Sequence, residues 1–418
     1  MIDWNYVFAN SILGGELSFD VNAVSLSRDF TVNTTDSATS SNSRLSVDVN
    51  WRRRLTDQIG ITYTPFANLR GDLISVNDSY NGVDTAILDD QSRARGYVAA
   101  GLTAEYPWLA RTTSASHVVS PIGQVIARTG SNADDQAELP NEDARSLVFD
   151  DTNLFEVDKF SGFDRIETGS RANVGLQYTF QADNGGHARI LAGLSFRLDD
   201  ENPFERPGQI PVAPADPAGG IQTEPTFNED NGLDTRRSDV VVGAYLSPNS
   251  MFQVISQARF DEDGFGLRQA DIFARVAYGP IFASGSYAFT SNEFARENLQ
   301  SECFLNGSPV LDSNGDPVCD DQQELIANIG VRLSEFWTLS AGTRYDIDSD
   351  FRLQDTVGLK YADECFVLAV SYTETRIEDE SRDLEPDRTI MVRFDLKHIG
   401  QFQTNTSINS LLEADSTE

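Results

Sequence analysis

Apolar and polar residues alternate along most of this chain. Residues 171–180 show the pattern clearly. Their polar or small positions are Arg171, Asn173, Gly175, Gln177 and Thr179, and the positions between these are Ala172, Val174, Leu176, Tyr178 and Phe180. Because successive side chains of a β-strand point to opposite faces, such a segment has one apolar and one polar face. The chain contains about seventeen segments of this kind, most of roughly 9–13 residues.

The length of these segments distinguishes two kinds of all-β protein. Strands of soluble sandwiches are usually about 5–6 residues long, whereas a tilted strand that crosses a membrane needs about 9–11. Short turns alternate with long loops, as they do between the two ends of an outer-membrane barrel. Aromatic residues lie near segment ends, where a membrane interface would hold them: Trp51, Tyr106, Trp108, Trp337, Tyr345, Tyr361 and Tyr372. The pattern therefore favours a large antiparallel transmembrane β-barrel over a soluble β protein.

The chain divides into a barrel part, residues 1–400, and a polar C-terminal tail, residues 401–418. Within the barrel part, residues 131–165 end in a stretch without periodicity that mixes acids with phenylalanines, which predicts a packed loop leading into a strand. Further polar loops are expected at 31–43, 71–92, 199–235 and 291–322. No apolar run approaches the roughly 18 residues of a transmembrane helix, and the N-terminus carries no signal peptide. We therefore expect the sequence to lack an upstream part of the protein.

Charge excludes one class of partner. The 418 residues include 65 acidic and 32 basic side chains, for a formal net charge of −33. Nucleic-acid phosphates need a basic surface, so we expect no nucleic-acid partner. The three histidines are scattered and provide neither a catalytic triad nor a pair of metal ligands. The chain is thus expected to have no catalytic residues, no cofactor and no metal site.

The three cysteines do not form a disulfide scaffold. Cys303 and Cys319 flank a turn-rich segment and are candidates for a disulfide in an oxidising compartment. No other cysteine or histidine lies close enough in the sequence to suggest a metal site there. Cys365 is left over.

One long motif resembles a known family. Residues 150–178 resemble the signature of the C-terminal barrel domain of the LPS-assembly protein LptD, the organic solvent tolerance protein family. The matching residues are Asp150, Asn153, Leu154, Phe155, Phe160, Ser161, Gly162, Phe163, Asp164, Arg165, Glu167, Gly169, Arg171, Ala172, Asn173, Gly175, Leu176, Gln177 and Tyr178. Residues 361–366, which contain Cys365, and the terminal strand at 389–400 are similar to two later parts of the family.

The resemblance implies an integral outer-membrane protein that inserts lipopolysaccharide into the outer leaflet. Its glycan would pass through the barrel lumen, and its lipid would leave through a lateral gate between the first and last strands. The implied partners are lipopolysaccharide, an LptE-like lipoprotein that plugs the lumen, an LptA-like periplasmic bridge that docks on an N-terminal domain missing from this sequence, and outer-membrane lipid. The activity would not be enzymatic. A general porin or transporter barrel is the alternative.

The resemblance also suggests roles for individual residues. The matching loop residues from Asp150 to Arg171 would form a structural or gating motif, in which Asp164 and Arg165 pair with each other or take part in gating. In the family, the cysteine at the position of Cys365 would pair with one in the N-terminal domain; a free thiol is the alternative for Cys365 in this chain. The side chains expected to face the lumen are Arg171, Asn173, Arg332, Arg344 and Arg393. These arginines would bind phosphates of the glycolipid or pair with lumenal acids.

Overall fold

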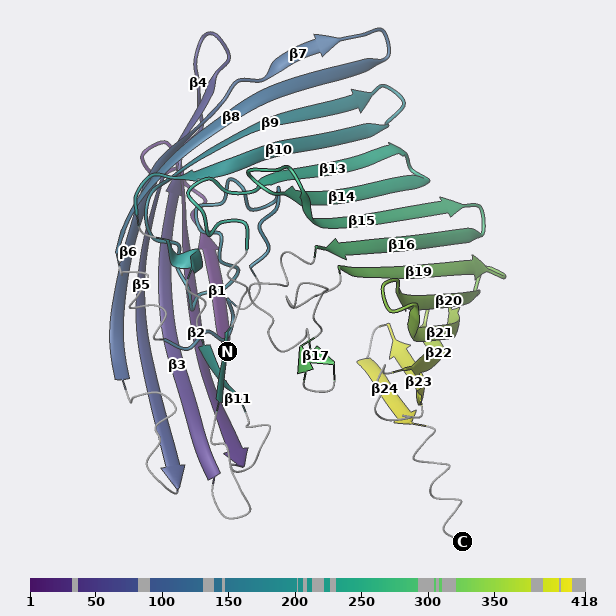
Figure 1. Ribbon diagram of the computed structural model, residues 1–418. Coiled ribbons are helices and arrows are strands. Elements are labelled where there is room, and N and C mark those ends of the chain that lie inside the picture. The colour runs from purple at the N-terminus through teal and green to yellow at the C-terminus, as the bar shows by residue number, and fades with distance from the viewer. Residues whose placement is uncertain are drawn as a thin grey trace.

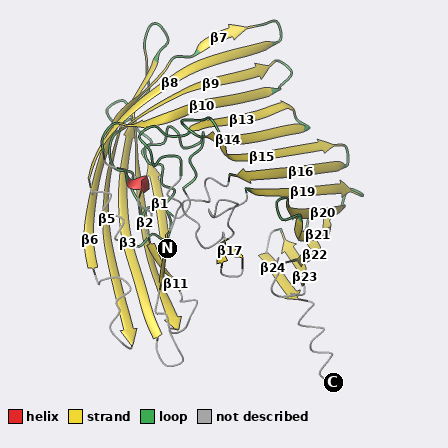
Figure 2. Ribbon diagram, in the orientation of Figure 1, coloured by secondary structure: helices red, strands yellow, loops and turns green. Residues whose placement is uncertain are grey.

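The computed structural model describes residues 1–31, 37–81, 91–130, 139–144, 147–200, 202–205, 209–212, 222–225, 231–291, 304–305, 308–309, 321–376, 386–397 and 400–407. Strands dominate it, and most belong to one curved antiparallel sheet of 20 strands (Figures 1 and 2). Among these residues, no helix is long and apolar enough to cross a membrane.

In chain order, the strands of the large sheet are β1 Ile2–Val7, β2 Glu16–Thr31, β3 Ser37–Arg52, β4 Leu55–Thr56, β5 Thr62–Asn81, β6 Gln91–Glu105, β7 Trp108–Arg111, β8 Ala115–Gly130, β9 Arg171–Ala182, β10 His187–Arg197, β13 Val240–Asn249, β14 Phe252–Phe260, β15 Leu267–Tyr278, β16 Ile281–Thr290, β19 Gln322–Arg332, β20 Trp337–Asp346, β21 Phe351–Ala362, β22 Phe366–Thr375, β23 Asp387–Leu396 and β24 Gly400–Ser407. Two small hairpins lie outside it: β11 Gln209–Val212 with β12 Gln222–Pro225, and β17 Phe304–Leu305 with β18 Ser308–Pro309. A short 3-10 helix, η1, spans Pro203–Glu205.

Each long strand pairs with its neighbours in chain order. The two-residue strand β4 continues the pairing of β3 with β5, and β7 continues that of β6 with β8. At the ends of the sheet, the described pairings join β1 to β2 and β24 to β23, and no described pairing joins β1 to β24. The sheet is therefore a curved wall that is not closed (Figure 1).

The two faces of this wall differ in polarity as the sequence predicts. On the outward face of β5, β6 and β9, the apolar side chains of Leu69, Val98 and Leu176 are exposed. On the opposite face of the same strands, Arg70, Arg95 and similar polar side chains are buried. A soluble β-sandwich would bury its apolar face instead. The apolar outer face and polar inner face confirm the predicted outer-membrane type of sheet.

Several predicted loop boundaries are wrong. The polar stretches 31–43 and 71–92 belong largely to β2, β3, β5 and β6, which extend 15 to 20 residues each. Likewise, residues 401–407, expected in the C-terminal tail, lie in β24. The reason is that ladder hydrogen bonds join backbone groups, so a strand can continue through a polar sequence once its neighbour is in place. Alternation detects only the part of a strand that has an apolar face.

Replacing Leu176 by arginine tests the orientation of the sheet. Leu176 is half exposed at the centre of β9, on the apolar outer face. An arginine facing lipid near the bilayer midplane costs about 2–4 kcal/mol. Leu176→Arg should lower the free energy of unfolding from lipid vesicles by about that amount, measured by denaturant titration of heat-modifiable mobility. Asp183→Arg, in the exposed turn that follows β9, is the control and should change it little.

Candidate functional site

A long connection between β8 and β9 packs against the concave face of the sheet. Its described residues are 139–144 and 147–170, and we call them the inner loop. Leu154 and Phe160 of the loop pack in one apolar cluster with Phe204, Leu233 and Val241. Ile166 packs in a second cluster with side chains of β6 and β8. The inner loop overlaps the stretch 131–165 for which a packed loop is predicted, and it continues to residue 170.

Five arginines from adjacent strands face this loop. Arg44 lies on β3, Arg70 on β5, Arg95 on β6, Arg128 on β8 and Arg171 on β9. All five are buried, none being more than 9% exposed. We call them the inner arginine row. Isolated buried charges are costly, so the loop must supply acceptors for these guanidinium groups.

At the first position of the row, Arg44 binds two loop carboxylates. It forms an ion pair with Asp143 at 2.8 Å and a close ion pair with Asp164, and it donates to Asn22 of β2 at 2.9 Å. Asp164 also accepts the backbone N–H of Glu142 at 2.6 Å. Burial raises the pKa of Asp164 in spite of Arg44, with a further rise from Asp143. Burial also opposes ionisation of Asp143, but Arg44 outweighs it and holds that pKa low.

The next two members of the row converge on the loop backbone. Arg70 and Arg95 both form ion pairs with Asp72 of β5, at 2.9 and 2.7 Å. Both also donate to the carbonyl oxygen of Phe163, and Arg95 donates to that of Asp164 at 2.8 Å. The Phe163 ring lies 5.1 Å from the Arg70 guanidinium, which adds a cation–π contact. One turn of the loop therefore occupies donors from three strands.

Glu167 is the buried centre of the other half of the network. Its carboxylate lies 3.1 Å from Arg128, 2.7 Å from Arg171 and 3.9 Å from Lys159 of the loop. Burial opposes the charge of Glu167, but the attraction of these three cations outweighs it and keeps its pKa low. Burial lowers the pKa of Lys159 to about 8. Burial, followed by repulsion from Glu167, raises the pKa of Asp158 to about 6.

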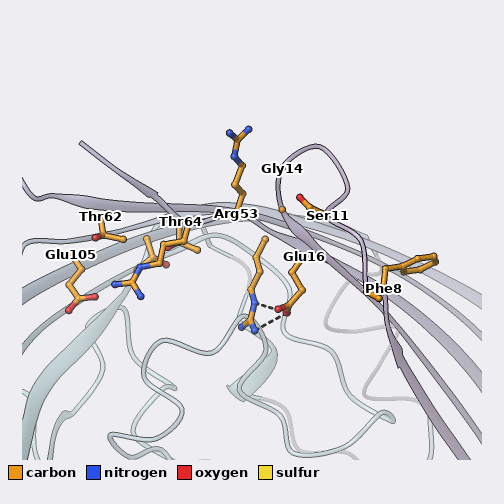
Figure 3. A pocket seen from close by; sticks show the side chains of 13 residues that line it. Phe8, Ser11, Gly14, Glu16, Arg53, Thr62, Thr64 and Glu105 are labelled. Atoms are coloured by element: carbon orange, nitrogen blue, oxygen red, sulfur yellow. Dashed lines mark hydrogen bonds and ion pairs between the residues drawn. The ribbon is translucent and has the colours of Figure 1, made fainter. Parts of the chain in front are cut away.

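A separate pocket of about 690 Å³ opens beside the short turns that join β1 to β2 and β3 to β5 (Figure 3). Glu16 and Arg52 stand opposite each other on β2 and β3 and form a 2.8 Å ion pair. Arg53 points to the other side of the sheet from Glu16 and donates to the carbonyl of Leu13 at 3.2 Å. The exposed Glu16–Arg52 pair adds about 0–1 kcal/mol at most. Because the lining mixes glutamates with arginines, the pocket has no marked preference for either charge.

The sequence of this chain is similar to those of known proteins. A family model described as LptD, LPS transport system D, matches residues 1–306. The chain belongs to the LptD family. The LPS-assembly protein LptD of Alcanivorax borkumensis is 24% identical over 284 residues, which are 67% of this chain and 31% of that protein. The protein of the same name from Saccharophagus degradans is 24% identical over 281 residues, or 65% of this chain and 28% of that protein.

This LptD-family chain spans less than a third of the length of those curated relatives. Among solved structures, the copper transporter OprC aligns over 97% of this chain and 71% of its own, with 9% identity and a TM-score of 0.35. The predicted family resemblance is confirmed, and family membership together with the apolar outer face places the chain in the outer membrane as an integral protein.

Most of the motif residues of the LptD resemblance lie in or against the inner loop. Leu154 and Phe160 pack in its apolar cluster, and the Phe155 carbonyl accepts a hydrogen bond from Gln124 of β8 at 2.9 Å. Asp150 accepts one from Gln257 of β14 at 3.1 Å and, through its backbone N–H, donates to Asn153 at 3.1 Å.

Four further motif residues have distinct surroundings. Gly162 has no room for a side chain, because a Cβ atom there would collide with Asp143. Ser161 is exposed at the adjoining turn. The expected pairing of Asp164 with Arg165 is wrong. Asp164 pairs with Arg44 instead, while Arg165 donates to the carbonyls of Leu139 and Pro140 at 2.7 and 3.4 Å. Arg165 also donates to the backbone carbonyl of Asp164 at 3.3 Å, while the Asp164 carboxylate binds Arg44.

The other predicted site residues are spread over the sheet. Arg171 and Asn173 are buried on the inner face, where Asn173 donates to Gln124 at 2.6 Å. Arg344 pairs with Glu324 at 2.5 Å and Arg393 with Asp395 at 2.9 Å, which is the acid-paired alternative of the sequence analysis. Arg332 is exposed. Cys365 is a free, exposed thiol in the turn before β22, and Cys303 and Cys319 lie outside the described residues.

Sequence reasoning missed four members of the inner arginine row: Arg44, Arg70, Arg95 and Arg128. Each occupies a polar position of an alternating strand, so each could have been assigned to the inner face. What alternation cannot indicate is that the positions of five strands come into line opposite one loop. Strand register, set by pairing over the whole sheet, decides that.

Replacing Glu167 by glutamine tests the buried charge cluster. The change leaves Arg128, Lys159 and Arg171 without their shared anion, and breaking a buried pair typically costs about 3–5 kcal/mol. Glu167→Gln should lower the free energy of unfolding by about this much in urea titrations. The control is Asp263→Asn, whose side chain is 90% exposed and pairs with Arg237 on the surface. Equal effects of the two changes would contradict a special role for Glu167.

The raised pKa of Asp158 predicts a pH dependence. The folded protein retains the Asp158 proton up to about pH 6, whereas the unfolded chain releases it near the ordinary value of 3.8. Between these values the folded state binds more protons, so Asp158 makes the free energy of unfolding fall as pH rises. Asp158→Asn removes this contribution. Its free energy of unfolding, relative to the unmodified protein, should rise from about pH 4 to about pH 6 and then level off. A flat difference across that range would contradict the assignment.

Proposed function

We propose that this chain forms part of the wall of an LptD-type translocon, which inserts lipopolysaccharide into the outer leaflet of the outer membrane. The observation that carries the proposal is the polarity of the sheet, which is polar and arginine-rich on its concave face and apolar on its convex face. Together with family membership, this suits an amphipathic cargo. Because the chain spans less than a third of its relatives, it would supply a portion of the complete wall.

The division of labour between the two faces follows from solvation. The hydrated glycan would move along the inner face, where polar side chains replace its water. The acyl chains would leave sideways between strands into the bilayer, because passage through a polar lumen would cost them their contact with lipid. The inner loop would narrow the lumen and act as a gate. No bond is made or broken in this process, so the activity is transport and not enzymatic.

The proposed partners complete the path. A periplasmic LptA-like bridge would deliver lipopolysaccharide to a domain of the full-length protein, and an LptE-like lipoprotein would occupy part of the lumen. The concave surface of β15 to β22 suits such a plug, because its polar side chains are less buried than those facing the inner loop. The alternative, a general porin or transporter, would use the same inner face for small solutes.

Depletion in the bacterium that produces the protein tests this function. Lipopolysaccharide reached by a membrane-impermeant label on intact cells should fall, while the amount labelled after lysis should not. Re-expression of the full-length protein should restore surface labelling. Normal surface labelling after depletion would contradict the proposal. Normal labelling combined with steady single-channel conductance of the purified protein in planar bilayers would support the porin alternative.

A further inference from the structure

The inner arginine row and the inner loop together have the geometry of a binding site that is already filled. We propose that the row is a track for phosphate groups of an anionic glycan, and that residues 161–168 of the loop occupy this track as an internal competitor. The inference rests on the proposed function for the source of the glycan, a phosphorylated glycolipid.

Most of the carboxylates that pair with the inner arginine row come from the loop. The row places five guanidinium groups on one face of five adjacent strands. Asp72 is the carboxylate that these strands contribute to the ion pairs described above. The other carboxylates in those pairs, Asp143, Asp164 and Glu167, come from the loop. When residues 161–168 move away, Asp164 and Glu167 leave with them, while the ion pairs with Asp72 and Asp143 remain. The five guanidinium groups then keep a surplus of positive charge that water or another anion must satisfy.

The guanidinium groups of the row contact oxygen atoms of the loop in the way that arginines contact phosphate. Arg70 and Arg95 converge on one oxygen, the Phe163 carbonyl, and Arg44 holds carboxylate oxygens of two different residues. Arginines bind phosphate in a similar way: several guanidinium groups donate to oxygen atoms that all belong to one phosphate group. A carbonyl has no net charge, so a phosphate oxygen at the same place would make stronger, charge-assisted hydrogen bonds.

The loop does not provide an acceptor for every hydrogen-bond donor of the inner arginine row. Among the described residues, Nε of Arg44 and Nη1 of Arg171 are buried and find no hydrogen-bond acceptor. The loop therefore leaves donors of the row unused, which a ligand with more acceptor oxygens would satisfy. The loop is also held in two different ways. Its 154–160 part is anchored by the apolar cluster around Leu154 and Phe160, whereas 161–165 is held mainly by the polar contacts to the row.

This division predicts which part of the loop can leave. A phosphate can replace hydrogen bonds and ion pairs but cannot replace apolar packing. Residues 161–168 would therefore be displaced while the apolar anchor stays in place, with loss of the packing of Ile166 and of the contacts between the Phe163 ring and two arginines of the row. Displacement would open the lumen at the same place where it exposes the arginines.

Hydrogen exchange of the purified full-length protein tests the proposal. The probes are inorganic tripolyphosphate, deacylated lipopolysaccharide, and the same glycan after phosphatase treatment. The first two should raise amide exchange in residues 161–168 and leave residues 154–160 unchanged, and the dephosphorylated glycan should have no effect. Asp143→Asn combined with Asp164→Asn weakens the competitor and keeps its shape. The double change should lower the tripolyphosphate concentration at half-effect about tenfold, since charge-assisted hydrogen bonds are lost from the loop.

Two controls define the outcomes. Adding Arg70→Gln to the double variant should weaken tripolyphosphate binding again, whereas the surface change Asp263→Asn should do nothing. The proposal is overturned if neither the unmodified protein nor the double variant binds tripolyphosphate, if Arg70→Gln has no effect, or if both forms of the glycan act alike. If tripolyphosphate binds to the track but lipopolysaccharide delivery is normal after depletion, only the proposed function is contradicted. If depletion does impair lipopolysaccharide delivery but tripolyphosphate does not bind, only the proposed phosphate track is contradicted.

Discussion

Burial of five guanidinium groups on one face of a sheet is the constraint on which this structure depends. A buried cation without an anion is expensive, and the strands of the inner face supply few carboxylates of their own. A loop from elsewhere in the chain must therefore enter the concave side and bring acceptors with it. Asp164 and Glu167 meet this demand at the two ends of the row. The position of the loop thus satisfies an electrostatic requirement, which adds to its apolar packing around Leu154, Phe160 and Ile166.

The distribution of charge within the chain is uneven for the same reason. Acids outnumber bases by 65 to 32, yet the buried charged side chains of the described residues comprise seven arginines and one lysine against five acids. Arginine suits this place because it stays charged when buried and because its planar fork reaches several acceptors at once. Lys159 illustrates the contrast. The same environment that leaves the arginines charged lowers the lysine pKa to about 8.

The two faces of the wall give the loop its functional meaning. An outer face rich in exposed leucine and valine requires lipid, so water and polar cargo are confined to the concave side. The inner loop covers this concave side between β3 and β9. An anchor made of apolar contacts and a tip held by ion pairs allow one part of the loop to stay while another responds to charge. The structure therefore combines a stable sheet with a loop whose tip is held mainly by ion pairs and hydrogen bonds.

The sequence by itself determined the class of fold, the orientation of the sheet and the family, because these depend on local alternation and on one long motif. It also indicated that Leu154 and Phe160 lie in a packed loop. It did not determine where polar strands end, as in β5, because backbone pairing continues without an apolar signal. Nor did it identify the partner of Asp164, which lies 120 positions away on β3. Only tertiary structure decides such contacts, since they follow from the register of many strands and from the cost of burying charge.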